Sequence, residues 1–272
     1  MHQKNKSIQK RYEGFLQTPS LWQHKSICEL QPFIIAPKFT KIAIEIDENQ
    51  RLGKYIERLV SYQLQQEKDI EILAENIQIQ RHKITLGELD CLLLRNQEAI
   101  HLEIVYKFYL YDATVGHDEI GHFIGPNRKD SLIEKLEKLS KKQLPLLYSN
   151  EVKNYLQTMG ISSEKISQQV YFKAQLFMPL SLKDHNLSIL NSECIAGFYI
   201  NITQLKTFSN DKFFIPVKKD WLVIPHQHVT WISFDDFSIK ANEFLHQKYA
   251  PLCWLKLKSG EIQKFFLVWW GF

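Results

Sequence analysis

Cysteines are few in this sequence, and their spacing excludes the usual cysteine-built sites. Cys28, Cys91, Cys194 and Cys253 are far apart, and no CxxC pair is present. Neither a zinc knuckle nor a disulfide framework is indicated by such a pattern. Cys91 and Cys253 lie inside apolar runs, where cysteine behaves as a small buried hydrophobe.

Long apolar runs are also missing. No stretch approaches the roughly 20 apolar residues that span a membrane as a helix. The first residues, "MHQKNKSIQKR", are basic and lack the apolar centre of a signal peptide. Internal repeats and low-complexity segments are absent as well. We therefore expect a cytoplasmic protein with reduced cysteines and no membrane partner.

A strong charge of one sign is the next feature that the sequence lacks. The 272 residues include 34 Lys and Arg against 30 Asp and Glu, which gives a net charge of +4. With 44% hydrophobic and 24% charged residues, the composition is that of a globular protein of one large or two modest domains. The weak positive charge is compatible with a polyanionic partner, and solvated surface lysines explain it equally well.

The order of secondary-structure signals predicts an α/β fold. A helix is expected from Asp47, where "DENQ" offers an N-cap before apolar residues at helical spacing. Three strand-like runs follow: "ILAENIQIQRHKI", "GELDCLLLR" and "AIHLEIVYKFYLY". A lysine-rich helix over 128–143, capped by Asn127 or Asp130, precedes a short helix over 151–159 that ends at Gly160. The run "VYFKAQLFM" adds a strand, so an α-β-β-β-α-(α)-β order indicates a mixed central sheet flanked by helices.

Beyond residue 185 the sequence changes to short aromatic β-runs. They are "IAGFYI", "WLVIP", "VTWISF" and "WLKLKSGEIQKFFLVWW", with "KSGE" as a hairpin turn and one helix near 236–248. We therefore divide the chain into an N-terminal helical arm (1–40), a core (41–185) and a C-terminal β-rich region (186–272), which is either separate or packed on the core.

Two acids interrupt the apolar strands of the core. If Asn96 and Gln97 form a two-residue hairpin loop, Arg95 pairs with Glu98 and Asp90 lies directly opposite Glu103. Directly opposed side chains have Cβ atoms about 4.5 to 5.5 Å apart, where two like charges are destabilising. Such a pair needs a proton, water or a cation, and magnesium is a cation that favours carboxylate oxygens.

Strand alternation puts further polar side chains on the same face as these two acids. The face is expected to carry Glu88, Asp90, His101, Glu103 and Lys107, together with Val105. This set suits metal-assisted phosphodiester hydrolysis, in which a lysine positions the attacking water or stabilises developing charge. The ordinary alternative is a solvated face with cross-strand ion pairs. The neighbouring "LLL" and "IVYKFYLY" instead indicate a sheet buried on both faces, where acids need partners.

Several segments resemble the bacterial domain-of-unknown-function family 1853. They are "FLQTPSLW", "GELD", "HLEIVYKFYL", "GPNRKDSLIEKLEKLSKKQLPLL" and "GFYI". That family is placed by fold comparison among PD-(D/E)XK nuclease-like proteins, which share an αβββαβ core. The resemblance implies Asp90 and Glu103 as metal-binding acids, with Glu57 as a further acid from the first helix. It also implies a lysine two residues after the second acid, where this chain has Val105; Lys107 is the available substitute.

The resulting hypothesis is a Mg²⁺- or Mn²⁺-dependent nuclease acting on DNA or RNA. Asp90, Glu103 and Lys107 would be catalytic, while Glu88 and His101 would support them. Lys135 and Gln143 on the lysine-rich helix would contact the phosphate backbone, although such a helix is also typical of a solvated face.

Two other functions remain open. Val105 favours a nuclease-like fold that binds nucleic acid or a protein without cutting. A zinc hydrolase using His117 and His122 is the other, although the two histidines in "GHDEIGH" do not have the spacing of HExxH.

Overall fold

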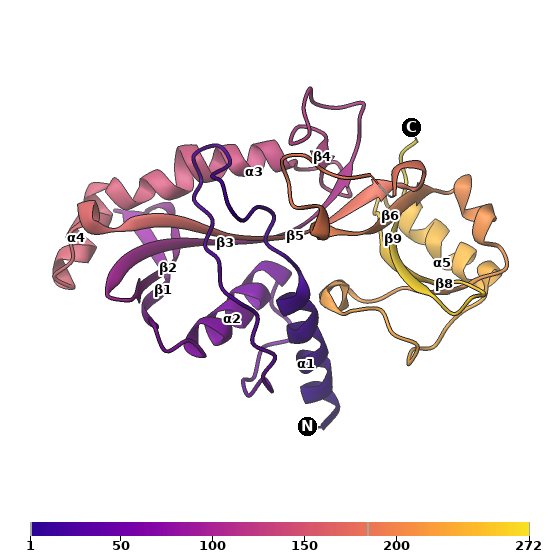
Figure 1. The fold of residues 1–272 in the computed structure, drawn as a ribbon, viewed down its shortest axis with the longest axis horizontal. Coiled ribbons are helices and arrows are strands. Elements are labelled where there is room, and N and C mark those ends of the chain that lie inside the picture. Colours follow the sequence, from indigo (N-terminus) through magenta and orange to yellow (C-terminus); the bar gives the residue numbers. More distant parts are fainter. Residues whose placement is uncertain (1, 184, 272) are drawn as a thin grey trace. The chain divides into compact units, whose positions relative to one another are not determined.

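The computed structural model describes residues 2–183 and 185–271 of the chain as a mixed α/β fold (Figure 1). Its α-helices are α1 (His2–Gln17), α2 (Leu52–Gln65), α3 (Leu132–Lys138), α4 (Asn150–Thr158) and α5 (Phe234–His246). Its strands are β1 (Ile70–Arg81), β2 (Ile84–Arg95), β3 (Glu98–Tyr111), β4 (Phe123–Ile124), β5 (Ser167–Pro179), β6 (Ile195–Asn201), β7 (Lys212–Phe214), β8 (Leu252–Lys256) and β9 (Ile262–Val268). Of these described helices, none is both long and apolar enough to cross a bilayer.

The nine strands form one mixed sheet flanked by helices, as expected from the sequence. Hydrogen bonding orders eight of them β1-β2-β3-β5-β6-β9-β8-β7, and β4 pairs with β3. The β1–β2, β2–β3, β7–β8 and β8–β9 pairs are antiparallel, whereas β5–β6 and β6–β9 are parallel.

The chain divides into two compact units that interleave along the sequence. The hairpin unit comprises residues 20–106 and 133–173, and the C-terminal unit comprises residues 1–19, 107–132 and 174–272. Our sequential division at residues 40 and 185 remains a prediction.

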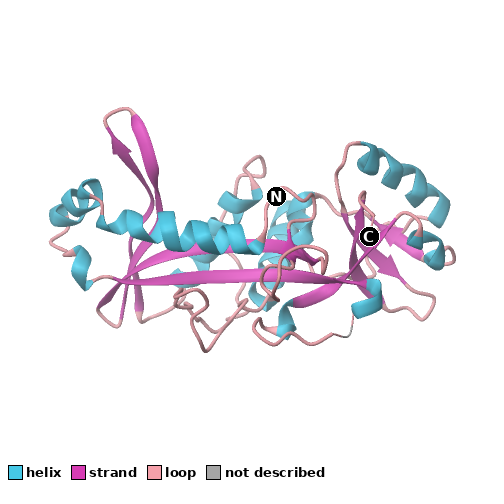
Figure 2. Cartoon of the chain, turned by 90° about the horizontal axis from the view of Figure 1, so that it is seen from above, coloured by secondary structure: helices cyan, strands magenta, loops and turns pink. Residues whose placement is uncertain are grey.

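The hairpin unit contains the element order that the sequence predicts. Its main elements run α2, β1, β2, β3, α3, α4 and β5. Figure 1 shows α2 on one side of the strands and the segment from α3 to α4 on the other. Strand β2 pairs with β3 only from residue 91 onward, so the remainder of β2 is paired with β1 alone. Figure 2 shows the β1–β2 hairpin projecting beyond the longer strands. The sheet therefore splits between β2 and β3 at residue 90.

The helix expected from Asp47 begins later. Residue 51 is the N-cap of α2 and makes no side-chain capping bond. Asp47 Oδ1 instead accepts a hydrogen bond from the backbone N–H of Asn49, 2.9 Å away, which closes a short turn. The predicted apolar stripe is correct, since Ile56 and Leu59 are among its buried residues. The helix position was therefore predicted better than its start, because an Asp side chain favours turns as readily as caps.

The single helix predicted over 128–143 is also shorter and less regular than expected. After α3 the chain forms a π-helical segment, η1 (Leu139–Gln143), and then a 3₁₀ segment, η2 (Leu144–Tyr148). Pro145 lacks the N–H that an α-helix would need and lies in the first turn of η2. The expected caps are used elsewhere: Asn127 Oδ1 accepts from the backbone N–H of Ala250, and Asp130 pairs with Lys107.

In the C-terminal unit the last predicted hairpin is confirmed and two shorter β-runs are wrong. Strands β8 and β9 are joined through "KSGE", where Gly260 adopts a φ of +90°. Helix α5 forms close to the predicted 236–248, with Ser233 as its N-cap. "WLVIP" instead overlaps a 3₁₀ segment, η7 (Lys218–Leu222), and "VTWISF" contributes only a bridge from Ile232 to Phe213. Short apolar runs bury their side chains from turns as well as from strands, so their pattern did not separate the two.

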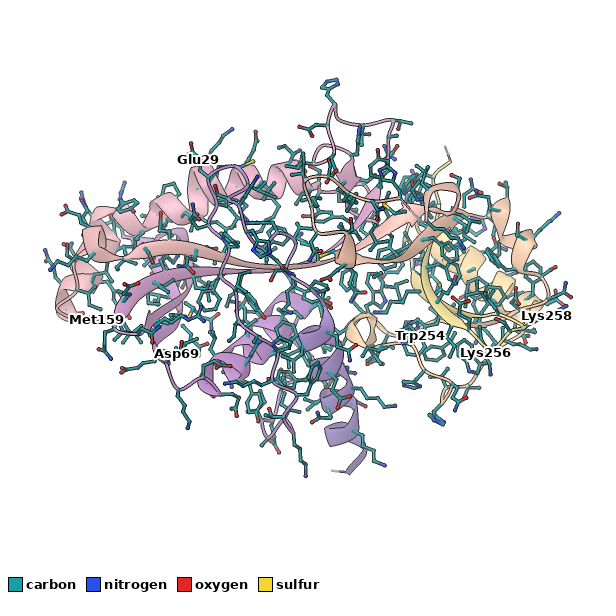
Figure 3. All side chains as sticks on the ribbon, in the orientation of Figure 1. Glu29, Asp69, Met159, Trp254, Lys256 and Lys258 are labelled. Carbon is teal, nitrogen blue, oxygen red and sulfur yellow. The ribbon has the colours of Figure 1, made fainter. Side chains whose placement is uncertain are left out.

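Aromatic packing fills the core of the C-terminal unit. Phe213 stacks on Phe237 with ring centroids 4.3 Å apart, and Phe265 packs against both. Trp254, labelled in Figure 3, is 1% exposed, and Trp221 is equally buried. These tryptophans belong to the core and are not available to stack on a nucleic-acid base.

Candidate functional site

The β2–β3 hairpin has the predicted two-residue loop. Asn96 and Gln97 both have positive φ values, 50° and 69°, as in the type I′ turns that suit the twist of a two-residue hairpin. Arg95 pairs with Glu98, and the ladder continues in register as far as the pair of residues 91 and 102. The predicted register is therefore confirmed over this ladder.

The turn is also held to the start of β1. Asp69, labelled in Figure 3, accepts a hydrogen bond from Arg95 Nε at 3.2 Å through its carboxylate. Its carbonyl accepts from the backbone N–H of Asn96 at 2.9 Å. These two contacts fix the end of the hairpin from a third segment of the chain.

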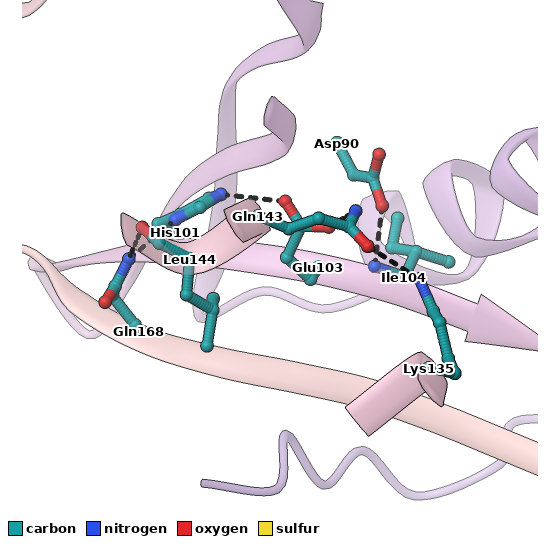
Figure 4. Close-up of polar contacts among 8 residues, drawn as sticks. All are labelled: Asp90, His101, Glu103, Ile104, Lys135, Gln143, Leu144 and Gln168. Atoms are coloured by element: carbon teal, nitrogen blue, oxygen red, sulfur yellow. Dashed lines mark hydrogen bonds and ion pairs between the residues drawn. The ribbon is translucent and has the colours of Figure 1, made fainter. Parts of the chain in front are cut away.

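Asp90 lies where the sheet splits. Its Oδ2 accepts a hydrogen bond from the backbone N–H of Ile104, 2.9 Å away (Figure 4). The carboxylate therefore satisfies a β3 donor just beyond Leu102, where the β2–β3 ladder ends. Glu103 lies close enough that its charge acts on the Asp90 carboxylate. The two acids are together on one face, as the hairpin register predicted.

Glu103 is fully buried and is held by two polar side chains from other elements. Gln143, at the end of η1, donates from Nε2 to Glu103 Oε2 at 2.5 Å (Figure 4). Lys135 on α3 donates to Gln143 Oε1 at 2.8 Å. His101 Nε2 lies 3.1 Å from Glu103 Oε1. The carboxylate is therefore connected to a cation through one amide side chain.

A further residue, Gln168 on β5, fixes His101 and was not found from the sequence. Its Nε2 donates to the Leu144 carbonyl at 2.6 Å and lies 3.1 Å from His101 Nδ1. Because an amide nitrogen only donates, Nδ1 accepts and Nε2 carries the proton that it donates to Glu103. Burial lowers the pKa of His101 to about 4, with Asp90 opposing, so the ring is neutral at pH 7. Nothing in the local pattern around Gln168 signals this role.

Burial and mutual repulsion favour protonation of the two acids. The pKa of Asp90 rises to about 7, first because of burial and then because of Glu103; the Ile104 N–H and Lys135 oppose this. Burial also raises the pKa of Glu103 to about 7, again against Lys135. A pair of this kind resists full ionisation near neutral pH, and a bound cation would relieve both causes.

Two more acids lie near the pair and share one lysine. Lys54 bonds with Glu88, and its Nζ is 2.9 Å from Glu57 Oε2. Glu57 Oε2 is nevertheless buried and has no hydrogen-bond partner of acceptable geometry among the described residues. Burial raises the pKa of Glu57, and Asp90 and Glu88 add to the rise. Glu57 therefore lies at the edge of the acidic pair and is held there by Lys54.

The lysine position differs from what the resemblance implies. Val105 is 4% exposed and packs in the core. Lys107, the expected substitute, donates to Asp130 at 2.5 Å in the C-terminal unit. Lys135 is instead the cation that acts on both Asp90 and Glu103. The structure thus joins Lys135 and Gln143 to the acids, and the catalytic assignment of Lys107 remains a prediction.

The donor set fits a hard divalent cation that keeps much of its water. Within the described parts of the chain, no group of three or more His, Cys, Asp or Glu side chains is arranged to hold a metal ion. Mg²⁺, however, is often bound by one or two carboxylates plus water and substrate oxygens. Asp90 and Glu103 offer such a pair, and Glu57, which Lys54 holds, is close enough for the charge of Asp90 to act on it.

The histidine loop offers less support for zinc. His122 Nδ1 lies 2.6 Å from the Val115 carbonyl, and Glu119 accepts hydrogen bonds from the backbone of residues 188–190. These contacts close a surface loop. His117 is exposed, and among the described residues of this loop no group of three or more such side chains is arranged to hold a metal ion.

Comparison with known proteins identifies the chain at the level of a family. No curated protein and no solved structure matches it. One family model matches residues 13–268, nearly the whole sequence. The chain belongs to the family described as a domain of unknown function, DUF1853.

Proposed function

We propose that this protein is a Mg²⁺- or Mn²⁺-dependent phosphodiesterase of the PD-(D/E)XK nuclease type, acting on DNA or RNA. The observation that carries the proposal is the electrostatically coupled pair of Asp90 and Glu103 at the split between β2 and β3. A buried acid and a half-buried acid that repel each other are costly unless a proton or a cation accompanies them. A bound cation with open coordination positions for water and phosphate would explain why the protein keeps this costly pair.

The chain's own residues have distinct parts in this proposal. Asp90 and Glu103 hold the cation, which when bound polarises the phosphate and lowers the pKa of a water ligand. Gln143 and the Nε2–H of His101 each donate to one oxygen of Glu103, so the orientation of that carboxylate is fixed. Asp90 is oriented by the backbone of Ile104. The pair is therefore positioned before any ligand arrives, as catalysis by fixed charges requires.

Lys135 supplies the positive charge of the site in this proposal. It approaches the acids from α3 and reaches them through Gln143. In that position it stabilises the charge that develops on the phosphate during attack. Lys107 is held by Asp130, so its removal is expected to matter less than that of Lys135.

The test is cleavage of labelled nucleic acids by the full chain. Purified protein is incubated with single- and double-stranded DNA and RNA in Mg²⁺, in Mn²⁺ and in a chelator. Asp90→Asn and Glu103→Gln keep the side-chain shape and lower the charge, and Glu98→Gln at the exposed turn is the matched control. We expect cleavage that needs the metal, is lost in the two site variants and persists in the control. Metal-independent cleavage, or equal cleavage by all variants, would overturn the proposal.

A second candidate function is binding without cutting. It is favoured by Val105, which occupies the position that the PD-(D/E)XK pattern gives to lysine and is buried there. The same protein preparations distinguish the two functions through a gel-shift measurement. Binding by every variant, with no cleavage by any of them in either metal, would support the binding module.

A further inference from the structure

A separate cavity lies in the C-terminal unit. It has a volume of about 540 Å³, within the range of small-molecule pockets. Its lining is more apolar than polar, with neutral polar residues such as Gln17, Thr18, Gln175 and Gln263 among the apolar ones, and it includes Lys264. The metal-dependent site proposed above uses none of these residues, so the cavity needs its own explanation.

Lys264 is a buried lysine on a central strand. It lies on β9, where its backbone pairs with Gly197 of the parallel strand β6. A Cβ atom at Gly197 would be only 2.1 Å from the Lys264 carbonyl oxygen, so the close approach of these strands requires glycine. The residue is 7% exposed although it contributes to the cavity wall.

The contacts of the Lys264 amine match its neutral form. Nζ donates to Gln175 Oε1 at 2.9 Å and to the Trp221 carbonyl at 2.8 Å. These are two neutral acceptors, and a neutral amine has two N–H groups, so both hydrogens are used and one lone pair remains. An ammonium group would keep a third N–H, and no carboxylate among the described residues is bonded to it. Burial alone lowers the pKa of Lys264 to about 7.

The charges around the cavity also argue against an anion as its ligand. Lys183 is the other lysine of the wall, and Glu193 and Glu261 are the acids. The wall is therefore close to neutral or slightly acidic, depending on the charge of Lys264. A neutral ligand with a polar group suits it better than a phosphate or a carboxylate does.

We propose that Lys264 is a nucleophilic amine that forms a Schiff base with a small neutral aldehyde or ketone bound in this cavity. The Nζ lone pair attacks the carbonyl carbon to give a hemiaminal. The hydroxyl of that adduct then leaves as water, and a C=N bond replaces the C=O bond. Desolvated lysines react in this way because more of the amine is neutral.

The first test measures the rate of imine formation at individual lysines. The folded full-length protein is treated near pH 7 with limiting propanal and sodium cyanoborohydride, and propylation at each lysine is followed by peptide mass spectrometry. At pH 7 an amine of pKa 7 is about half neutral, whereas an ordinary lysine is about one part in 2,500 neutral. Even with restricted access, we expect Lys264 to react at least about tenfold faster than Lys183, and the advantage to vanish in denaturing urea.

A second variant separates reactivity from a purely structural role. Gln175→Glu keeps the shape of the acceptor and adds a charge next to the amine, which favours the ammonium form. We expect propylation of Lys264 near pH 7 to fall by about tenfold or more, with Lys183 unchanged. If Lys264 is protected in the folded wild-type protein, or reacts no faster than Lys183, it only ties strands together and the proposal is wrong. An unchanged rate in a folded Gln175→Glu variant would also overturn it.

Discussion

The acidic pair should make the metal-free protein less stable as the pH rises. The pKa values of Asp90 and Glu103 are both raised above the values of the unfolded chain. The folded protein therefore binds more protons than the unfolded chain between about pH 4 and pH 7. Below about pH 4 both acids are protonated, and the pair makes its full contribution to folding stability. This contribution is lost as the pH rises through that range, because the folded state must then hold two buried charges.

The magnitude follows from the change at Asp90. A pKa of about 7 in place of 3.8 corresponds to about 4 kcal/mol, since each pKa unit is worth about 1.4 kcal/mol. Asp90 and Glu103 interact electrostatically and titrate as a pair, so this free energy is counted once. Asp90→Asn keeps an oxygen that accepts from the Ile104 N–H and removes one of the two charges. The variant should be more stable than the wild type at about pH 8 by up to about 4 kcal/mol, and similar to it at about pH 4.

Urea-induced unfolding, followed by tryptophan fluorescence from about pH 4 to pH 8.5 in a chelator, measures this directly. The measurement that matters is the difference in the free energy of unfolding between wild type and Asp90→Asn at each pH. The contributions of the other titrating groups largely cancel in this difference. Glu98→Gln removes an exposed acid from the same hairpin and should follow the wild type within about 0.5 kcal/mol. Millimolar Mg²⁺ should restore stability to the wild type at high pH and leave Asp90→Asn unchanged. Parallel curves for wild type and Asp90→Asn would refute the reasoning, because the pair would then carry no buried charge.

Three further outcomes can be checked with simple variants. Glu103→Ala leaves two buried donors without an acceptor, so we expect a loss of about 2 to 4 kcal/mol in the free energy of unfolding by urea. In the cleavage assay, Lys135→Met should lower the metal-dependent rate at least about tenfold, whereas Lys107→Met should change it less than about threefold. Equal losses in the two lysine variants would contradict the roles assigned here. Gly197→Ala forces a Cβ into the Lys264 carbonyl, so thermal denaturation followed by circular dichroism should show a destabilisation of several kcal/mol. An unchanged melting temperature would show that the strands can separate without cost.

The β2–β3 hairpin was predictable because its determinants are local. The polar break "RNQE" fixes a two-residue loop, and the loop fixes every pair counted back from it as far as Cys91 and Leu102. The approach of Asp90 to Glu103 follows from the same count. The side chains that complete the site come from η1 and β5, at positions 143 and 168, which no local pattern relates to the hairpin. These two side chains therefore reach the site through long-range packing, which the spacing of residues in the sequence does not predict.

The lysine that acts on the two acids shows most clearly what the sequence could not predict. The PD-(D/E)XK pattern implies a lysine at the position of Val105, and alternation along β3 makes Lys107, on the same face as Glu103, the expected substitute. The structure buries the valine and pairs the lysine with Asp130. A lysine from α3 reaches the acids instead, and its position depends on how that helix packs on the strands. The irregular segment after α3 has the same origin: Pro145 signals a break in the helix, yet nothing in the sequence specifies the π turn that carries Gln143.

The two acids differ in what they would cost to replace, and this difference favours a ligand. Asp90 has a structural use, because its carboxylate takes the backbone N–H of Ile104 where the sheet splits. An Asn side chain would satisfy that donor without any charge. Glu103 instead accepts from two side chains, those of His101 and Gln143, which each hold one of its oxygens. An apolar core at this place would need none of the three, and would avoid the repulsion with Asp90. The proposed cation, shared by both carboxylates, would give this network a use that folding stability alone does not.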